Sequence, residues 1–259
     1  MAPHGNRRAT VVAAVGYGTA ELRPDPRHPQ AWTLLVDGVP QSYVDLADPT
    51  RLGFPYLMLL GSLMRLCAPP RVPLTVLHLG GGGLTLARLI DHLRPGSAQR
   101  VIDRDRPLLD LVVRVLPPPA AVELVVGDAR ELLEQQEQAG YDVIVADVFD
   151  GAWLPDTVAT SGFAAAAHSA LRPGGLFAMN FTDVPPPSRT KVQVATLRSV
   201  FADVCLLANP DLLRGRTAGN AVLAAGDDLG DLPIRTGAMH GAALNAFSMG
   251  ARARLDEPE

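Results

Sequence analysis

Four consecutive glycines and three later aspartates are the residues of this sequence that could do chemistry together. The glycines, residues 80–83, follow an apolar stretch that ends at Leu79, and Asp103, Asp128 and Asp147 each stand where a later apolar stretch ends. Glycine has no Cβ, so a backbone built from it can approach a ligand closely. Carboxylates accept hydrogen bonds from the hydroxyl and amino groups of a nucleoside. The pattern therefore indicates a nucleoside-binding site.

Each of these residues also has a purely structural interpretation when it is taken alone. An aspartate at the start of a helix can be an N-cap, and a glycine run can be a tight turn. The joint placement favours the site, because the carboxyl ends of parallel strands face one crevice. Asp103 follows the glycines by about twenty residues, the interval at which an acid binds the ribose in dinucleotide folds. Asp128 could then accept from an adenine amino group.

The sequence of the loop favours S-adenosylmethionine over a dinucleotide. Residues 80–85 read GGGGLT and lack the second glycine pair of the GxGxxG fingerprint. Residues 171–176, LRPGGL, combine a helix stop with the start of a strand, a familiar feature of the methyltransferase-type fold. The sequence thus predicts a fold that binds S-adenosylmethionine or a related nucleoside.

On these motifs the chain resembles the spermidine synthase family, over roughly residues 32–225. The matching segments are Leu35-Val36-Asp37-Gly38-Val39-Pro40-Gln41-Ser42, the loop at residues 80–85, Asp103-Arg104-Asp105, Gly127-Asp128 and Asp147-Val148-Phe149-Asp150-Gly151. The resemblance implies S-adenosylmethionine or decarboxylated S-adenosylmethionine as the donor, with no metal. It implies a small amine as the acceptor and a possible homodimer through the N-terminal sheet.

The resemblance also implies roles for individual residues. Asp147 and Tyr56 would be catalytic, with Asp147 taking the proton of the attacking amine. The residues that would bind the donor are Gln41, Gly80, Gly81, Gly82, Gly83, Asp103, Asp128 and Ala129. Asp150 would bind a nitrogen of the acceptor. Phe149 and Trp153 are placed in the acceptor pocket only because they stand beside the Asp147 segment, and they could equally be loop anchors. By contrast, His78 stands alone on an apolar strand, where a hydrogen-bonded core histidine is the expected reading.

Two positions depart from the family pattern. The family's loop aspartate is Gly83 here, and its Tyr-His-Glu segment appears as Tyr56-Leu57-Met58. Each missing carboxylate removes a charge-assisted hydrogen bond of about 1.5–3 kcal/mol. Three functions stay open: an aminopropyltransferase, a methyltransferase that uses intact S-adenosylmethionine on a small molecule, and a non-catalytic nucleoside-binding protein.

An alternation of strands and helices has to position these residues. Strands are predicted at 75–79, 99–103, 122–126, 143–147 and 176–181, and helices at 85–92, 107–115, 129–139 and 160–171. The central strands are continuous Val/Ile/Leu runs, as in parallel strands that are buried on both faces. These units predict an α/β fold, a Rossmann-like, doubly wound and mostly parallel sheet of the methyltransferase type. A helix at 191–201 and strands at 204–208 and 220–225 are expected to form an antiparallel edge.

The N-terminal part reads as a small antiparallel β-sheet. Apolar runs at 10–15 and 32–36 flank a Pro-rich loop, and Asp37-Gly38 supplies a turn. An apolar helix is expected from about residue 54 to 66. The predicted division is an N-terminal β-strand subdomain at 1–53, a connecting helix at 54–72 and the nucleoside-binding domain at 73–259.

Composition excludes several other classes of protein. The net charge is −4, from 23 basic and 27 acidic residues, and predicts no role in nucleic acid binding. No apolar run approaches the ~18 residues of a membrane span. The apolar run at 10–16 after Arg7 and Arg8 is short for a signal peptide, so a first β-strand is expected there. Two distant cysteines and scattered histidines predict no disulfide or metal site, and the protein is expected to be cytoplasmic.

Overall fold

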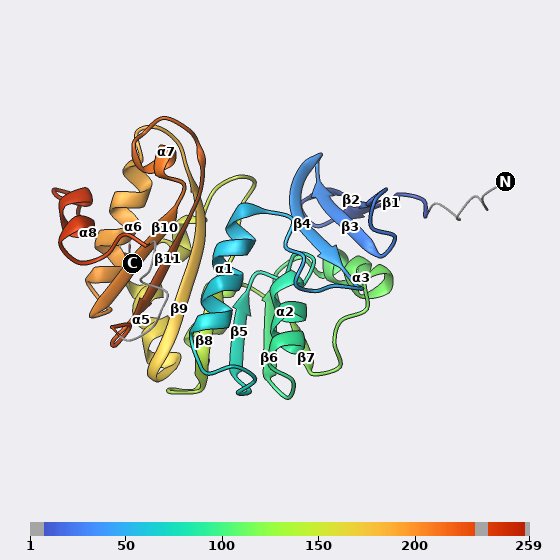
Figure 1. Ribbon diagram of the computed structural model, residues 1–259, viewed down its shortest axis with the longest axis horizontal. Helices are drawn as coiled ribbons and strands as arrows, with labels where there is room; N and C mark the ends of the chain where they lie inside the picture. The colour runs from blue at the N-terminus through green and yellow to red at the C-terminus, as the bar shows by residue number, and fades with distance from the viewer. Residues whose placement is uncertain (1–7, 231–237, 257–259) are drawn as a thin grey trace.

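The computed structural model describes residues 8–230 and 238–256, and two β-sheets lie within those ranges (Figure 1). The smaller is an antiparallel sheet in the order β1-β2-β3-β4. Its strands are β1 Val11–Val15, β2 Gly18–Pro24, β3 Ala31–Val36 and β4 Val39–Asp45. The expected N-terminal antiparallel sheet is therefore confirmed, with β2 as an additional strand that the sequence did not suggest.

The larger sheet has seven strands in the order β10-β11-β9-β8-β5-β6-β7. The strands are β5 Thr75–Leu79, β6 Ala98–Asp103, β7 Val122–Val126, β8 Tyr141–Ala146, β9 Leu171–Asp183, β10 Asp203–Ala208 and β11 Gly219–Gly226. The five strands from β9 to β7 in this order pair in parallel, whereas β11 is antiparallel to both of its neighbours. From β5 the chain adds β6 and β7 on one side and then returns to place β8 on the other side of β5. The strand order thus reverses between β5 and β8, and doubly wound sheets bind ligands at such a point.

Helices cover both faces of the large sheet (Figure 1). They are α1 Pro55–Leu66, α2 Thr85–Leu93, α3 Arg106–Val115, α4 Ala129–Glu134, α5 Ser161–Ala170, α6 Ser188–Arg198, α7 Pro210–Leu213 and α8 Gly241–Phe247, with a 3-10 turn at Asp156–Val158. Leu60 and Leu89 of α1 and α2 pack on one face with Val143. Phe163 and Val194 of α5 and α6 pack on the other face.

The small sheet lies over α2 and α3 at one end of the large sheet (Figure 1). Its buried side chains, among them Leu22 and Leu34, share a core with Ala87 of α2 and Leu111 of α3. This docking places β4 over the carboxyl ends of the parallel strands. In β2 only one face is buried, so Ala20 and Leu22 alternate with more exposed residues, whereas β3 buries residues on both faces.

Two details of the large sheet differ from the sequence expectation. Helix α4 ends at Glu134 instead of continuing to 139, and Ala139 takes a left-handed backbone conformation (φ 52°) that turns the chain into β8. The two late strands do form an antiparallel pair, but β11 inserts between β9 and β10. Of these two strands, β10 is therefore at an edge of the sheet, and β11 is an interior strand.

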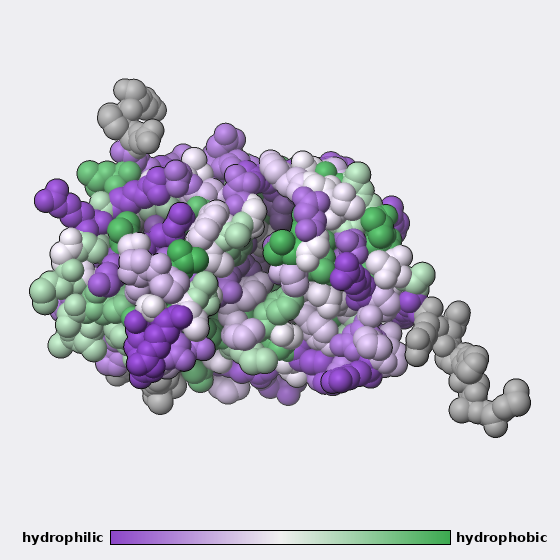
Figure 2. Space-filling view, turned by 90° about the horizontal axis from the view of Figure 1, so that it is seen from above, coloured by the Kyte–Doolittle hydropathy of each residue, from purple (hydrophilic) through white to green (hydrophobic). Residues whose placement is uncertain are grey.

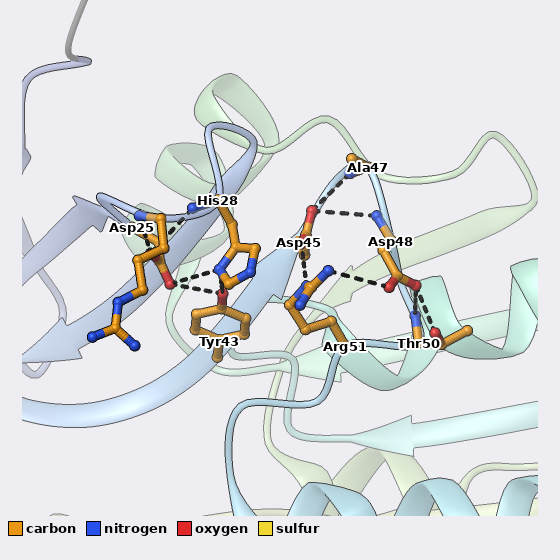
Figure 3. A network of polar contacts seen from close by, with 9 residues as sticks. Asp25, His28, Tyr43, Asp45, Ala47, Asp48, Thr50 and Arg51 are labelled. Carbon is orange, nitrogen blue, oxygen red and sulfur yellow. Dashed lines mark hydrogen bonds and ion pairs between the residues drawn. The ribbon is translucent and has the colours of Figure 1, made fainter.

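A polar network holds β4 and the segment that follows it (Figure 3). The Tyr43 hydroxyl donates to Asp25 at 2.9 Å, and the Arg51 Nε donates to Asp45 at the same distance. Asp45 is only 4% exposed, so its charge is held by a partner that reaches in from the surface. Tyr43 and Asp45 both belong to β4, and these contacts tie the strand to the loops on either side.

Candidate functional site

A cavity of about 550 Å³ opens at the carboxyl ends of β5, β6, β7 and β8, beneath β4 and the start of α1. Figure 2 looks onto this edge of the molecule, and the surface is hollowed near its centre. The volume lies within the range of about 300–1,000 Å³ that is usual for small-molecule sites. The cavity is therefore where the fold and the sequence both place a ligand.

The glycine loop and Asp103 form one wall of the cavity. The backbone N–H of Gly81 donates to Asp103 Oδ2 at 2.7 Å, and the N–H of Asp105 donates to Oδ1 at 2.9 Å. A carboxylate has about four lone-pair sites. Asp103 thus uses one on each oxygen to fix the loop and keeps acceptor capacity for a bound hydroxyl.

Asp128 and Ala129 line the same end of the cavity. Asp128 is the N-cap of α4, because its Oδ1 accepts the backbone N–H groups of Arg130 and Glu131 at 2.8 and 3.1 Å. The structural and the functional interpretation of this acid hold together: the cap orients the carboxylate while the residue faces the cavity.

Asp147 lies deeper, at the end of β8. Its Oδ1 accepts from the Asn180 side chain at 2.8 Å. Burial raises the pKa of Asp147 to about 6, and the hydrogen bond from Asn180 opposes that rise. At neutral pH most of this carboxyl group is ionised, so it can accept a proton.

Tyr56 reaches the cavity from α1. Its hydroxyl donates to the backbone carbonyl of Gln41 at 3.0 Å and joins the helix to β4. Burial, with the negative charge of Asp147, raises the pKa of Tyr56 well above its usual range, so the side chain stays a neutral phenol. The side chains of both Tyr56 and Gln41 line the cavity.

The mouth of the cavity is crossed by a charged bridge. Asp150 Oδ1 lies 3.5 Å from Arg104 Nη2, and the Arg104 guanidinium lies 4.0 Å from the centre of the Tyr17 ring. Tyr17 belongs to the turn between β1 and β2. The bridge thus runs from the small sheet to the loop after β8, where Phe149 also faces the cavity.

Of the predicted site residues, all but two line this cavity. Those that do are Gln41, Tyr56, Gly80, Gly81, Gly82, Asp103, Asp128, Ala129, Asp147, Phe149 and Asp150. Trp153 lies outside it, with the Arg189 guanidinium 4.2 Å from its ring centre. Gly83 does not line the cavity, and its N–H donates to Ser42 Oγ of β4 at 3.0 Å.

Sequence reasoning missed Asn180 and Asn220, which both line the cavity. The available signal was a polar residue within the apolar strand 176–181, at the carboxyl end of the fifth parallel strand. His78 is the core histidine that the sequence suggested: it is 4% exposed and lies 3.0 Å from Gln99 Oε1, and burial lowers its pKa to about 4.

Comparison with known proteins decides the family. Residues 63–205, more than half of the chain, match the family described as Spermine/spermidine synthase domain. The chain belongs to the spermine/spermidine synthase family. A crystal structure of a probable spermidine synthase from Corynebacterium glutamicum is 30% identical, with a TM-score of 0.87, and the match covers 97% of this chain and 98% of that one.

Curated members of the spermine/spermidine synthase family match over a shorter region. The polyamine aminopropyltransferase of Vibrio vulnificus is 28% identical over 169 residues, which is 62% of this chain and 53% of that protein. That of Chromobacterium violaceum is 28% identical over 149 residues, which is 54% of each protein. The matched region thus spans about half the length of these two relatives.

The structure gives a physical reason for the glycine at position 83. A Cβ on Gly83 would lie 2.8 Å from Val44 Cγ2 and 2.9 Å from Ser42 Cβ. These distances are too short for carbon atoms that are not bonded to each other. The docking of β4 on the loop therefore leaves no room for the acid of the spermidine synthase pattern.

We expect Gly83→Ala to lower the free energy of unfolding by about 1–3 kcal/mol, because the added methyl overpacks the contact with β4. The matched control is Gly219→Ala, where an added Cβ meets no atom within 4 Å. The control should change stability by less than about 0.5 kcal/mol. Urea unfolding of both variants measures the difference, and equal effects would contradict the packing argument.

Two features are absent from the described part of the chain, a metal-binding cluster and a membrane-spanning helix. No group of three or more His, Cys, Asp or Glu side chains among residues 8–230 and 238–256 is arranged to hold a metal ion. None of the helices in that part of the chain is long and apolar enough to cross a membrane.

Proposed function

We propose that this protein is a spermidine synthase-like transferase that moves an aminopropyl group from decarboxylated S-adenosylmethionine to an amine. The observation that carries the proposal is Asp147, a half-buried carboxylate that lines the same cavity as the glycine loop, Asp103 and Asp128. The family membership and the polyamine aminopropyltransferase names of its curated relatives support it.

The donor would occupy the end of the cavity between the glycine loop and the start of α4. Asp103 has acceptor capacity for ribose hydroxyls, and Asp128 with Ala129 would meet the adenine. Gly80, Gly81 and Gly82 let the backbone come close, and the Gln41 side chain faces the same space. When bound, the donor supplies an electrophilic carbon next to a sulfonium sulfur.

Asp147 would then act as the base. A primary amine has a pKa near ~10.4, as lysine does, and is protonated at neutral pH. The ammonium first gives one proton to Asp147, directly or through water, which frees the lone pair of the nitrogen. As the nitrogen then forms its bond to carbon, the bond from that carbon to sulfur breaks, the sulfur leaves as a neutral thioether, and the positive charge passes to the product nitrogen. Tyr56, a neutral hydroxyl close to Asp147, would orient the amine.

The acceptor would enter past Asp150 and Phe149. Asp150 already pairs with Arg104, so a second cationic nitrogen on the acceptor would have to compete with that guanidinium. Trp153 stands outside the cavity and would meet only an acceptor that extends beyond the mouth. These features support a small amine as the acceptor that binds at this end of the cavity.

Methyl transfer from intact S-adenosylmethionine is the second candidate. The specific observation in its favour is the packing of Gly83 against Ser42 and Val44, which removes the position of the acid in the family loop. Without that carboxylate, the cavity has one fewer group to hold the amino end of an aminopropyl donor.

One incubation distinguishes the candidates. We expect the protein, given decarboxylated S-adenosylmethionine and a set of small mono- and diamines, to release methylthioadenosine. Release of S-adenosylhomocysteine from intact S-adenosylmethionine would instead support methyl transfer. Binding of either donor without turnover would support a nucleoside-binding protein. Liquid chromatography with mass detection identifies the by-product in each case.

The remaining expectations belong to the same proposal. They are the division of the chain near residues 53 and 72, pairing of two copies through the small sheet, and a reducing cytoplasmic setting. The exposed Val12 and Val39 on the small sheet, at 60% and 52%, support the pairing.

A further inference from the structure

Two asparagines stand behind Asp147 in a chain of hydrogen bonds. Asn180, on β9, is 0% exposed and donates from Nδ2 to Asp147 Oδ1 at 2.8 Å. Asn220, on β11, donates from Nδ2 to Asn180 Oδ1 at 3.2 Å. The strands β9 and β11 are antiparallel neighbours, and Asn220 lies two residues from Val222, which pairs with Asn180. Three separate segments thus meet at one carboxylate.

The order of donors and acceptors in this chain has a consequence for Asp147. A side-chain amide has a donating nitrogen on one side and an accepting oxygen on the other. Because Asn220 donates to the oxygen of Asn180, the nitrogen of Asn180 is the atom that faces Asp147. A donor in that place stabilises the ionised carboxylate, whereas an oxygen would require a protonated one.

We propose that Asn180 and Asn220 are positioning residues that fix both the orientation and the charged state of the Asp147 carboxylate. Asn180 acts on it directly, and Asn220 acts through Asn180 by setting which end of the amide faces the acid. Oδ1 of Asp147 is held by this chain, so Oδ2 is the oxygen left for the acceptor. The proposal deepens the proposed function, on which its catalytic meaning rests.

Other ionisable groups near Asp147 are already committed to partners. The pairs are Tyr56 with the Gln41 carbonyl, His78 with Gln99, and Asp150 with Arg104. Asp103 and Asp128 lie at the donor end, where backbone N–H groups bind them. Among the described residues, the Asn180 amide is the side chain that hydrogen-bonds to the Asp147 carboxylate.

The decisive variant is Asn220→Asp, which keeps the shape of the side chain but replaces a donor with a negatively charged acceptor. The new carboxylate should attract the nitrogen of Asn180 and turn its oxygen toward Asp147. We expect the pKa of Asp147 to rise by about one unit or more. Asn220→Ala, which removes the donor without adding charge, should raise it by less.

The measurement is a ¹³C titration of the aspartate carboxyl groups by NMR, with the Asp147 signal identified by its loss in Asp147→Asn. Asn209→Asp is the matched control, because Asn209 caps α7 and aspartate caps equally well. The control should leave the Asp147 titration unchanged. An unchanged titration in both Asn220 variants overturns the proposal.

This test is independent of the reaction. If the wild-type protein transfers aminopropyl groups, the acidic limb of kcat/KM in Asn220→Asp should move by the same amount as the NMR titration, because both report the free protein. If no donor is turned over, the proposed function fails, yet the titration still decides whether the two asparagines control Asp147. A variant that merely loosened the fold would lower kcat/KM at every pH without shifting the acidic limb.

Discussion

Asp147→Asn is expected to lower turnover by about two to four orders of magnitude, the usual contribution of a positioned general base. The amide cannot take a proton from the attacking amine, but it has the shape of the carboxylate and can still accept from Asn180. Donor affinity, which depends on the opposite end of the cavity, should stay unchanged. Steady-state assays give the turnover, and calorimetry with decarboxylated S-adenosylmethionine gives the affinity.

The same variant should be more stable than the wild-type protein at neutral pH. The pKa of Asp147 is about 6 in the folded protein and near 3.8 when unfolded, because burial disfavours its charge. The folded state therefore binds the proton more tightly, and the stability that this gives below pH ~4 is lost as the pH rises through ~6. A shift of about two units corresponds to at most about 3 kcal/mol at 1.36 kcal/mol per unit.

A surface aspartate provides the control for both readouts. Asp110 lies on α3, is 65% exposed in its side chain and pairs only with Arg106 one turn away. Asp110→Asn should change neither kcat nor the thermal unfolding temperature appreciably. Turnover by Asp147→Asn within tenfold of the wild-type value would remove Asp147 from the role of base.

The large sheet was predictable because its strands carry their own burial pattern. The predicted strands at 75–79 and 122–126 agree with β5 and β7 end for end. β5 is an apolar run that is buried on both faces and can be read locally. β7 is an edge strand in which Glu123 and Val126 are exposed, so its apolar run indicated a strand but not burial on both faces. The glycines and acids follow from the ends of the same segments. For this reason Asp103, Asp128 and Asp147 could be placed around one crevice without a structure.

The asparagine chain could not be predicted, because it depends on strand order. Asn180 and Asn220 meet because β11 inserts between β9 and β10, and the sequence suggested only an antiparallel edge. The packing of Gly83 could not be predicted for a similar reason. Its contact with Ser42 exists because the small sheet docks over α2, and no local pattern encodes where two sheets touch.

Trp153 shows the limit of arguing from nearness in the sequence. It stands six residues after Asp147, and that nearness alone predicts a place in the acceptor pocket. In the structure the loop turns at Gly151, and a bridge between Asp150 and Trp153 closes it. The indole ring is carried outside the cavity and packs under Arg189.

Gly80→Ala is expected to lower the stability of this protein strongly. Gly80 has φ +93°, and a Cβ there would lie 2.2 Å from the carbonyl oxygen of Asp147 and 2.8 Å from its carbonyl carbon. Both atoms are backbone, so no side-chain rotation can relieve the contact. The variant should lose more than about 4 kcal/mol of unfolding free energy, beyond the range of ordinary substitutions.

Gly96→Ala separates this clash from backbone strain. Gly96 has nearly the same φ, +88°, but its added Cβ would meet only Pro73 Cγ at 3.7 Å, an ordinary contact. A left-handed conformation alone should cost about 1–3 kcal/mol. Denaturant unfolding of both variants therefore measures the close approach of β5 to Asp147 as a difference, and equal losses would show that strain alone explains Gly80.

Any folded Gly80→Ala protein must also displace Asp147, and a displacement of about 1 Å costs on the order of 100-fold in turnover. Gly96→Ala, far from the cavity, should keep full activity. A loss of turnover in Gly80→Ala alone would show that the glycine loop positions Asp147 as well as the donor.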